Sequence, residues 1–331
     1  MNIRHFAWAC TILGATAAGI ACGDTQTTPL ADGGGAVDGC SGNGCTDAPT
    51  PTEEDAQTDG GQSKNDADAK IDPVDAWQWQ PPVLPTTSAG CGIPKGALKN
   101  VTHTTPSGRT FHVWGPNNYD PDTNYPVALT YSGWYTNGPA FQSWFSMDQQ
   151  VGNDGLTVFP DSDGPEWDQF GMKDIKFFDE MMQVLADNYC INPSRVLGFG
   201  FSNGGIFMSH LGCLRAGYVK AISVGDGSKG GPGNACGRLP VLITHRTKDP
   251  DELIAWGYEN RDRWAGFNGC SLQSTPGNQT FNCTTQNNCK SPGSVMFCED
   301  TWFDPGWPNE WNHTVRPEYR QFTWDWFKAL P

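Results

Sequence analysis

Short apolar runs alternate with amphipathic segments from residue 110 to the C-terminus. The apolar runs contain few polar side chains, as expected for strands that are buried on both faces of a sheet. They cover residues 110–114, 126–131, 156–159, 195–200, 220–224, 241–245 and 295–298. Helical spacing of apolar residues is found at 174–189, where Asp174 is expected to be the N-cap, and at 203–214 and 317–330. The alternation predicts an α/β fold with a mostly parallel central sheet and helices on both faces.

The first 90 residues follow neither pattern. Residues 1–22 have a positive start at Arg4, an apolar stretch and small residues before Cys22, which is typical of a secretion signal. Cys22 also lies where a bacterial lipoprotein would be lipidated, so a membrane-anchored form and a freely secreted form are both open. We expect the protein outside the cell or on its outer surface.

Residues 23–90 are rich in Gly, Asp, Thr and Pro and carry 12 acidic residues against two Lys. A segment with so few aliphatic residues cannot bury enough apolar area to offset the loss of chain entropy. The sequence therefore predicts a disordered acidic tether, followed by one folded domain at 91–331.

Charge and cysteine content exclude some classes of function. The net charge is −15, which argues against a nucleic-acid partner, and the 12 Cys indicate an oxidising compartment. Eight of these cysteines lie in residues 91–331 and allow up to four disulfides, whose pairing the sequence does not fix. The six His are too dispersed for a zinc cluster, so we expect no metal and no cofactor, and we expect a monomer.

Ser202 lies in Gly200-Phe201-Ser202-Asn203-Gly204, between a predicted strand and a predicted helix. This pattern matches the G-x-S-x-G elbow, in which a sharp turn exposes a nucleophilic hydroxyl. A glycine-rich turn that merely contains a serine is the simpler alternative. The flanking strand and helix favour the elbow.

A serine nucleophile needs a base and a group that orients the base, in the order Ser, Asp or Glu, His for this type of fold. Asp249 follows a predicted strand and is the first candidate for the acid, ahead of Asp226 and then Asp251. His313 is the one histidine after Asp249, so position and elimination both favour it as the base. The simpler alternatives are a carboxylate at a helix N-terminus and a solvated surface histidine.

Two backbone N–H groups are needed to stabilise the oxyanion of an acyl-transfer reaction. One is expected from Asn203, directly after the nucleophile. The other is expected from Trp134, in the turn after the strand that ends at Tyr131. Flat tryptophan faces suit a sugar or a phenolic acyl group, which makes Trp134, Trp167, Trp307 and Trp311 candidate substrate contacts. Burial to anchor long loops is their more common role.

Four segments carry a resemblance to a known family. They are Val158-Phe159-Pro160-Asp161 with Trp167, the stretch 189–205, His245-Arg246-Thr247-Lys248-Asp249 and Asn312-His313-Thr314-Val315. Residues 91–331 thus resemble the secreted α/β-hydrolases of the feruloyl esterase, acetylxylan esterase and polyhydroxybutyrate depolymerase group. The resemblance implies an α/β-hydrolase fold and a triad of Ser202, Asp249 and His313.

Two departures from the family pattern leave the substrate open. The chain has Tyr131-Ser132-Gly133 where the family usually has His-Gly, and Arg246 replaces a glycine before the acid. We expect a secreted serine esterase that releases feruloyl or acetyl groups from plant cell-wall polysaccharide through an acyl-enzyme. A polyester depolymerase is the first alternative, and a non-catalytic surface lipoprotein that binds carbohydrate is the second.

Overall fold

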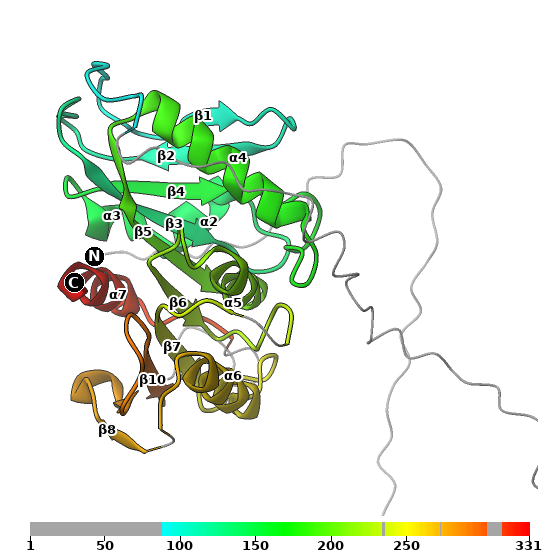
Figure 1. Ribbon diagram of the computed structural model, residues 1–331. Coiled ribbons are helices and arrows are strands. Elements are labelled where there is room, and N and C mark those ends of the chain that lie inside the picture. Colours follow the sequence, from blue (N-terminus) through cyan, green and yellow to red (C-terminus); the bar gives the residue numbers. More distant parts are fainter. Residues whose placement is uncertain (1–87, 234–235, 272, 303–312) are drawn as a thin grey trace, which may run out of the picture. The chain divides into compact units, whose positions relative to one another are not determined.

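The computed structural model describes residues 88–331 apart from 234–235, 272 and 303–312 (Figure 1). The predicted signal with Cys22, the predicted tether up to residue 87, and the candidate contacts Trp307 and Trp311 lie outside the described residues. No helix in the described part of the chain is both long enough and apolar enough to span a membrane.

A ten-stranded sheet forms the centre of the domain, in the order β1-β2-β4-β3-β5-β6-β7-β10-β9-β8. Six neighbouring strands, from β4 to β10, run parallel, and the strands outside them pair antiparallel. The strands are β1 (Val101–Thr104), β2 (Thr110–Trp114), β3 (Tyr125–Tyr131), β4 (Leu156–Pro160), β5 (Ile191–Phe201), β6 (Ala221–Gly225), β7 (Pro240–Arg246), β8 (Ser274–Pro276), β9 (Cys283–Gln286) and β10 (Ser294–Asp300).

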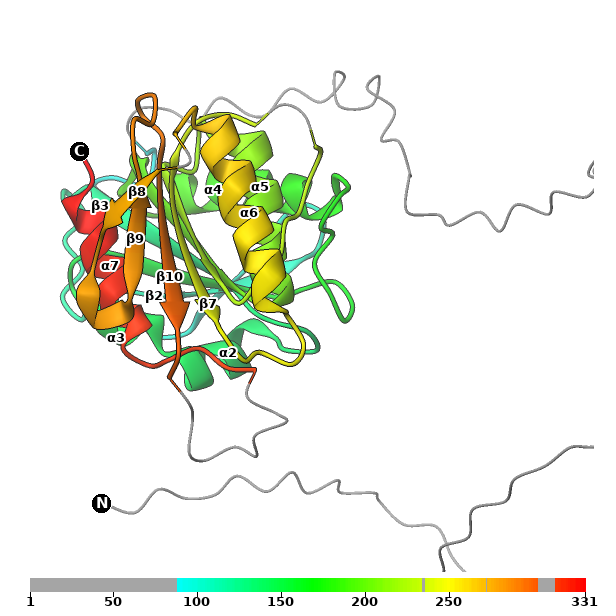
Figure 2. The ribbon, with the colours of Figure 1, turned by 90° about the horizontal axis from the view of Figure 1, so that it is seen from below.

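Helices cover both faces of this sheet, so the predicted fold class is confirmed. Figure 2 shows α4, α5 and α6 together on one face, with α3 and α7 on the other. The helices are α2 (Gly138–Phe145), α3 (Met147–Val151), α4 (Lys173–Asn188), α5 (Asn203–Arg215), α6 (Ile254–Phe267) and α7 (Tyr319–Ala329), with a short 3-10 helix η1 (Gln279–Phe281).

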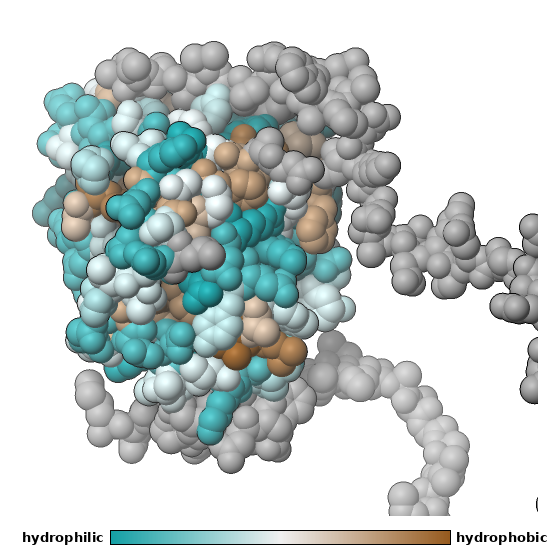
Figure 3. All heavy atoms as spheres, turned by 60° about the horizontal axis from the view of Figure 1, so that its bottom comes forward, coloured by the Kyte–Doolittle hydropathy of each residue, from teal (hydrophilic) through white to brown (hydrophobic). Residues whose placement is uncertain are grey.

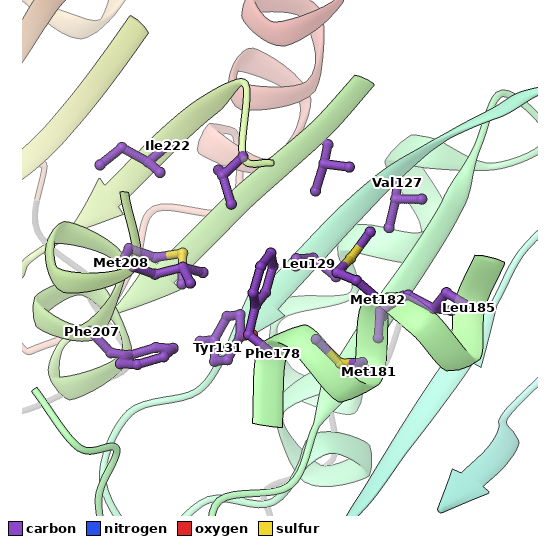
Figure 4. Close-up of a cluster of buried hydrophobic side chains, with 14 of the residues drawn as sticks. Val127, Leu129, Tyr131, Phe178, Met181, Met182, Leu185, Phe207, Met208 and Ile222 are labelled. Carbon is purple, nitrogen blue, oxygen red and sulfur yellow. The ribbon is translucent and has the colours of Figure 1, made fainter. Parts of the chain in front are cut away.

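Each face of the sheet has its own hydrophobic core, because side chains alternate along the strands. Along β3, Val127 and Leu129 point towards α4 and α5, where they pack with Phe178, Met182 and Met208 (Figure 4). Ala128 of the same strand belongs to the opposite cluster, which the aromatic side chains of α2 and α7 complete. The parallel strands are therefore fixed from both sides, and so are the loops at their carboxyl ends.

Four disulfides connect the eight cysteines of the domain, as the even count predicted. They are Cys91–Cys190, Cys213–Cys236, Cys270–Cys289 and Cys283–Cys298. Two of them hold β8, β9 and the neighbouring loops, a segment whose side chains add little to the main cores. Figure 3 shows a largely hydrophilic face with brown residues in small separate groups.

The structure corrects one predicted detail and adds elements that the sequence pattern did not predict. Asp174 is not the N-cap of α4, because the helix starts at Lys173 and Met172 occupies the cap position. The Asp174 carboxylate is instead buried in the first turn and pairs with Arg109. The added elements are β1, α2, α3, α6, η1, β8 and β9.

Candidate active site

Ser202 lies at the tight turn between β5 and α5, with φ 55° and ψ −125°. Few non-glycine residues adopt this backbone region, and such strain is characteristic of functional turns. Its N–H donates to Gly225 O at 2.8 Å, and its carbonyl accepts from Ile206 N at 2.9 Å. The turn is thus held by the end of β6 on one side and by the first turn of α5 on the other.

The two outer glycines of the motif are required by close backbone contacts. A Cβ on Gly200 would lie 2.0 Å from Gly204 O. A Cβ on Gly204 would lie 2.3 Å from Tyr131 O and 2.4 Å from Ser132 O. These distances are far below van der Waals contact, so α5 can start this close to β3 and β5 only with glycine at both positions.

Asp249 and His313, 64 residues apart in sequence, form a hydrogen bond of 2.6 Å between Oδ2 and Nδ1. Asp249 follows β7, and His313 precedes α7. The other oxygen of the carboxylate, Oδ1, accepts from Asp251 N at 2.9 Å and from Glu252 N at 2.8 Å. These three hydrogen bonds orient the carboxylate so that it holds the imidazole through Nδ1 and leaves Nε2 for another partner.

The environment of His313 favours its protonated form. Burial acts to lower the pKa of His313, but the hydrogen bond and the negative charge of Asp249 outweigh it, so the pKa is raised above 6.5. An imidazole in this environment takes a proton readily, and Asp249 stabilises the imidazolium that results.

The imidazole lies beside the serine turn. The rings of His313 and Phe201 are 4.8 Å apart, and Phe201 directly precedes Ser202. Within the described part of the chain, no hydrogen bond joins the Ser202 hydroxyl to His313.

The other two candidate acids do not contact the imidazole through a hydrogen bond in the described structure. Asp226 follows β6, and its Oδ1 accepts from Arg246 N at 2.7 Å. Asp251 is exposed and contributes its backbone N–H to Asp249. Of the three, Asp249 has the geometry of an acid that orients the base.

The turn after β3 lies against the nucleophile. A Cβ on Gly133 would be 3.4 Å from Ser202 Cβ, which brings the N–H groups around Trp134 close to the serine. Asn203, whose N–H is the other expected oxyanion donor, is buried at the start of α5. The segments that carry the two expected donors are thus both next to Ser202.

Trp167 joins these two donor segments. Its indole Nε1 donates to Ser132 O at 3.0 Å, and its backbone N–H donates to Asn203 Oδ1 at 2.8 Å. The side chain is only 1% exposed, so it has no free face for a substrate. Its burial does not fit the predicted substrate contact, and its two hydrogen bonds instead position the turn after β3 against the start of α5.

Trp134 is 59% exposed and has Tyr135 beside it, with 5.7 Å between the ring centroids. Sequence reasoning missed Trp144, which is 43% exposed on α2 and lies 5.1 Å from the ring of Phe201. We call Trp134, Tyr135 and Trp144 the aromatic strip. The only sequence signal for Trp144 was its place in an aromatic-rich stretch, since α2 itself was not predicted.

Asp161 fixes the helix that carries Trp144. Its Oδ1 accepts from Gly138 N at 2.8 Å, and its Oδ2 accepts from Thr110 Oγ1 at 2.6 Å and is 2.9 Å from His112 Nε2. The sequence Asp161-Ser162-Asp163-Gly164 superficially resembles a calcium-binding loop, but both carboxylate oxygens of Asp161 contact protein groups. Among the described residues no group of His, Cys, Asp or Glu side chains is arranged to hold a metal ion.

Known proteins similar to this chain are esterases. Feruloyl esterase D of Neurospora crassa is 29% identical over 205 residues, which cover 55% of this chain and 69% of the relative. A probable feruloyl esterase C of Aspergillus niger is 27% identical over 256 residues, covering 73% and 91%. No family model matches the chain.

A solved structure shares the fold. The acetyl xylan esterase from Aspergillus awamori superposes with a TM-score of 0.55 at 16% identity, covering 70% of this chain and 99% of that one. This likeness shows the α/β-hydrolase fold and confirms the predicted architecture.

Proposed function

We propose that this chain, a carboxylic ester hydrolase of the feruloyl and acetylxylan esterase group, cleaves ester-linked acyl groups from plant cell-wall polysaccharide with Ser202 as nucleophile. The hydrogen bond between Asp249 and His313 beside the strained Ser202 turn carries the proposal. The named relatives, which are feruloyl esterases, support the substrate class.

The proposed reaction has two steps. His313 accepts the Ser202 proton through Nε2 as the hydroxyl attacks the ester carbonyl, and Asp249 stabilises the imidazolium. The N–H groups of Asn203 and Trp134 stabilise the oxyanion. The alcohol of the polysaccharide leaves with the proton from His313, and a water molecule activated by the same imidazole then releases the acid.

The aromatic strip favours a phenolic acyl group such as ferulate over acetate. The half-exposed ring of Trp144 packs against Phe201, and the buried Phe201 ring packs against His313 and directly precedes Ser202 in sequence. Aromatic pairs contribute about 1 kcal/mol beyond area burial, which an acetyl group cannot gain.

A fluorophosphonate probe tests the nucleophile. The wild-type chain should be labelled and Ser202→Ala should not. An unreactive Ser202 in a folded protein would exclude the serine mechanism and favour a role in binding carbohydrate without turnover.

Substrate choice is tested with methyl ferulate, acetylated xylan and a hydroxybutyrate oligomer side by side. We expect Trp144→Ala to lower kcat/KM for methyl ferulate by about tenfold and to spare an acetyl ester, while Trp144→Phe retains most of the activity. Equal losses on both esters would contradict stacking on Trp144. Faster cleavage of the hydroxybutyrate oligomer would instead indicate a polyester depolymerase.

We also propose that the protein acts outside the cell. The four disulfides require an oxidising compartment. Residues 1–22 would direct export, and residues 23–90 would tether the domain if Cys22 is lipidated. Radiolabelled palmitate incorporation that is lost in Cys22→Ser would separate anchoring from free secretion.

A further inference from the structure

Asp226 is a buried carboxyl group at the centre of the site to which the proposed reaction gives no role. It is 3% exposed and has a positive φ of 43° directly after β6. Its N–H donates to Thr244 O at 2.9 Å, and its Oδ1 accepts from Arg246 N at 2.7 Å. Asp226 therefore holds the last residues of β7, three positions before Asp249.

Several charged groups surround this carboxyl. Arg246 faces it from the end of β7, and Asp249 faces it from the loop that follows. His313 faces it from the segment before α7, and the phenol of Tyr319 from α7. Glu252 and Asp251 add further acidic groups near His313. Burial, and then the negative charge of Asp249, raise the pKa of Asp226 to about 8. Asp226 is therefore mostly neutral at pH 7.

We propose that Asp226 is a positioning residue: its buried carboxyl group and its backbone N–H anchor the end of β7 and so place the loop that carries Asp249. A neutral acid provides the same acceptor for Arg246 N as a carboxylate would. Asp249 then remains the anion that orients the imidazole. The kinetic part of this inference depends on the proposed catalytic pair, whereas the protonation state does not.

Asp226→Asn is the matched variant. Asparagine keeps an acceptor for Arg246 N, tolerates a positive φ, and fixes the side chain in an uncharged form. Asp226→Ala removes the acceptor, and Asp251→Asn makes the same substitution at an exposed position near His313.

Thermal unfolding between pH 5 and pH 9 tests the protonation state of Asp226 independently of enzyme activity. The pKa of Asp226 is higher in the folded chain than its ordinary value of 3.8. Its contribution to stability is thus complete at low pH and is lost as the pH rises to about 8. We expect the Tm difference, Asp226→Asn minus wild type, to grow from pH 5 to pH 8 and then level off. A constant difference would overturn the neutral state of Asp226, and Asp251→Asn should show little change with pH.

The positioning role is tested with a cinnamate ester that lacks a phenolic proton. We expect kcat to fall several-fold more in Asp226→Ala than in Asp226→Asn, with KM little changed in both. We also expect the wild-type kcat/KM profile to show an inflection near pH 8 that Asp226→Asn lacks. Equal kcat values in the two folded variants would overturn the positioning role. If neither the wild type nor any variant hydrolyses an ester, the proposed function fails. The unfolding data still decide the protonation state of Asp226.

Discussion

One added methyl group at Gly204 should affect catalysis sharply. A Cβ there would lie 2.3 Å from Tyr131 O and 2.4 Å from Ser132 O, both backbone atoms of the turn that faces Ser202. Ordinary contact between such atoms needs more than 3 Å, so Gly204→Ala must separate α5 from the end of β3 by roughly 1 Å.

That displacement has two measurable costs. Overpacking of this size should lower the free energy of unfolding by about 1–3 kcal/mol. Moving the proposed oxyanion donors by about 1 Å relative to Ser202 should reduce kcat about 100-fold, which corresponds to about 2.7 kcal/mol in the barrier.

The assay compares kcat and urea unfolding for Gly204→Ala with those for Gly266→Ala. Gly266 lies in α6, and a Cβ there would meet nothing within 4 Å. The control should keep its activity and be neutral or up to about 1 kcal/mol more stable. If Gly204→Ala folds with wild-type kcat, the contact between α5 and β3 does not set the geometry of the site.

Three further changes test other contacts of the site and the domain. Asp249→Asn should lower kcat about 10⁴-fold with little change in KM, as loss of the orienting acid does in serine hydrolases. In wild type the acid limb of kcat/KM should lie above pH 6.5, because the pKa of His313 is raised and the neutral imidazole is the active form; a limb below pH 6.5 would contradict this. Trp167→Phe removes the bond to Ser132 O and should cost about 1 kcal/mol in unfolding free energy together with a loss of kcat, and unchanged kinetics would refute the positioning role. Replacing both Cys283 and Cys298 by Ser opens a link between residues 15 apart and should destabilise the domain by about 3 kcal/mol, seen as a lower Tm than that of the wild type when both are measured without reducing agent; an unchanged Tm would contradict this.

The parallel core of the fold could be predicted because its strands are buried on both faces and read as apolar runs. Helix α6 could not, since only Gly257, Asn260, Trp264 and Ala265 of its 14 residues are buried. These four residues lie at helical spacing, but Gly257 and Asn260 are not apolar, so the buried stripe does not stand out as an apolar pattern in the sequence. Helices α2 and α3 are short and separated by Ser146 at φ 49°, so neither extends far enough to show a period.

The order of the candidate catalytic residues along the chain could be predicted from the sequence, but the contacts between their side chains could not. The motif around Ser202 and the single downstream histidine are local features of the sequence. The contact between Asp249 and His313 forms because the segment before α7 meets the loop that follows the carboxyl end of β7. Trp167 shows why residue type alone was not enough to predict a substrate contact. A tryptophan in a loop can line the rim of the site or lie buried in the core, and only the packing of the folded chain decides between the two.

The two outer strands of the sheet have a consequence for the protein at high concentration. An exposed strand edge is a template on which another molecule can add a strand. Here β8 has only three residues, all exposed, and ends at Pro276, which has no N–H to offer; β1 has four residues. Both margins of the sheet are thus too short to pair well with a neighbour, which protects this broad sheet from growing into aggregates.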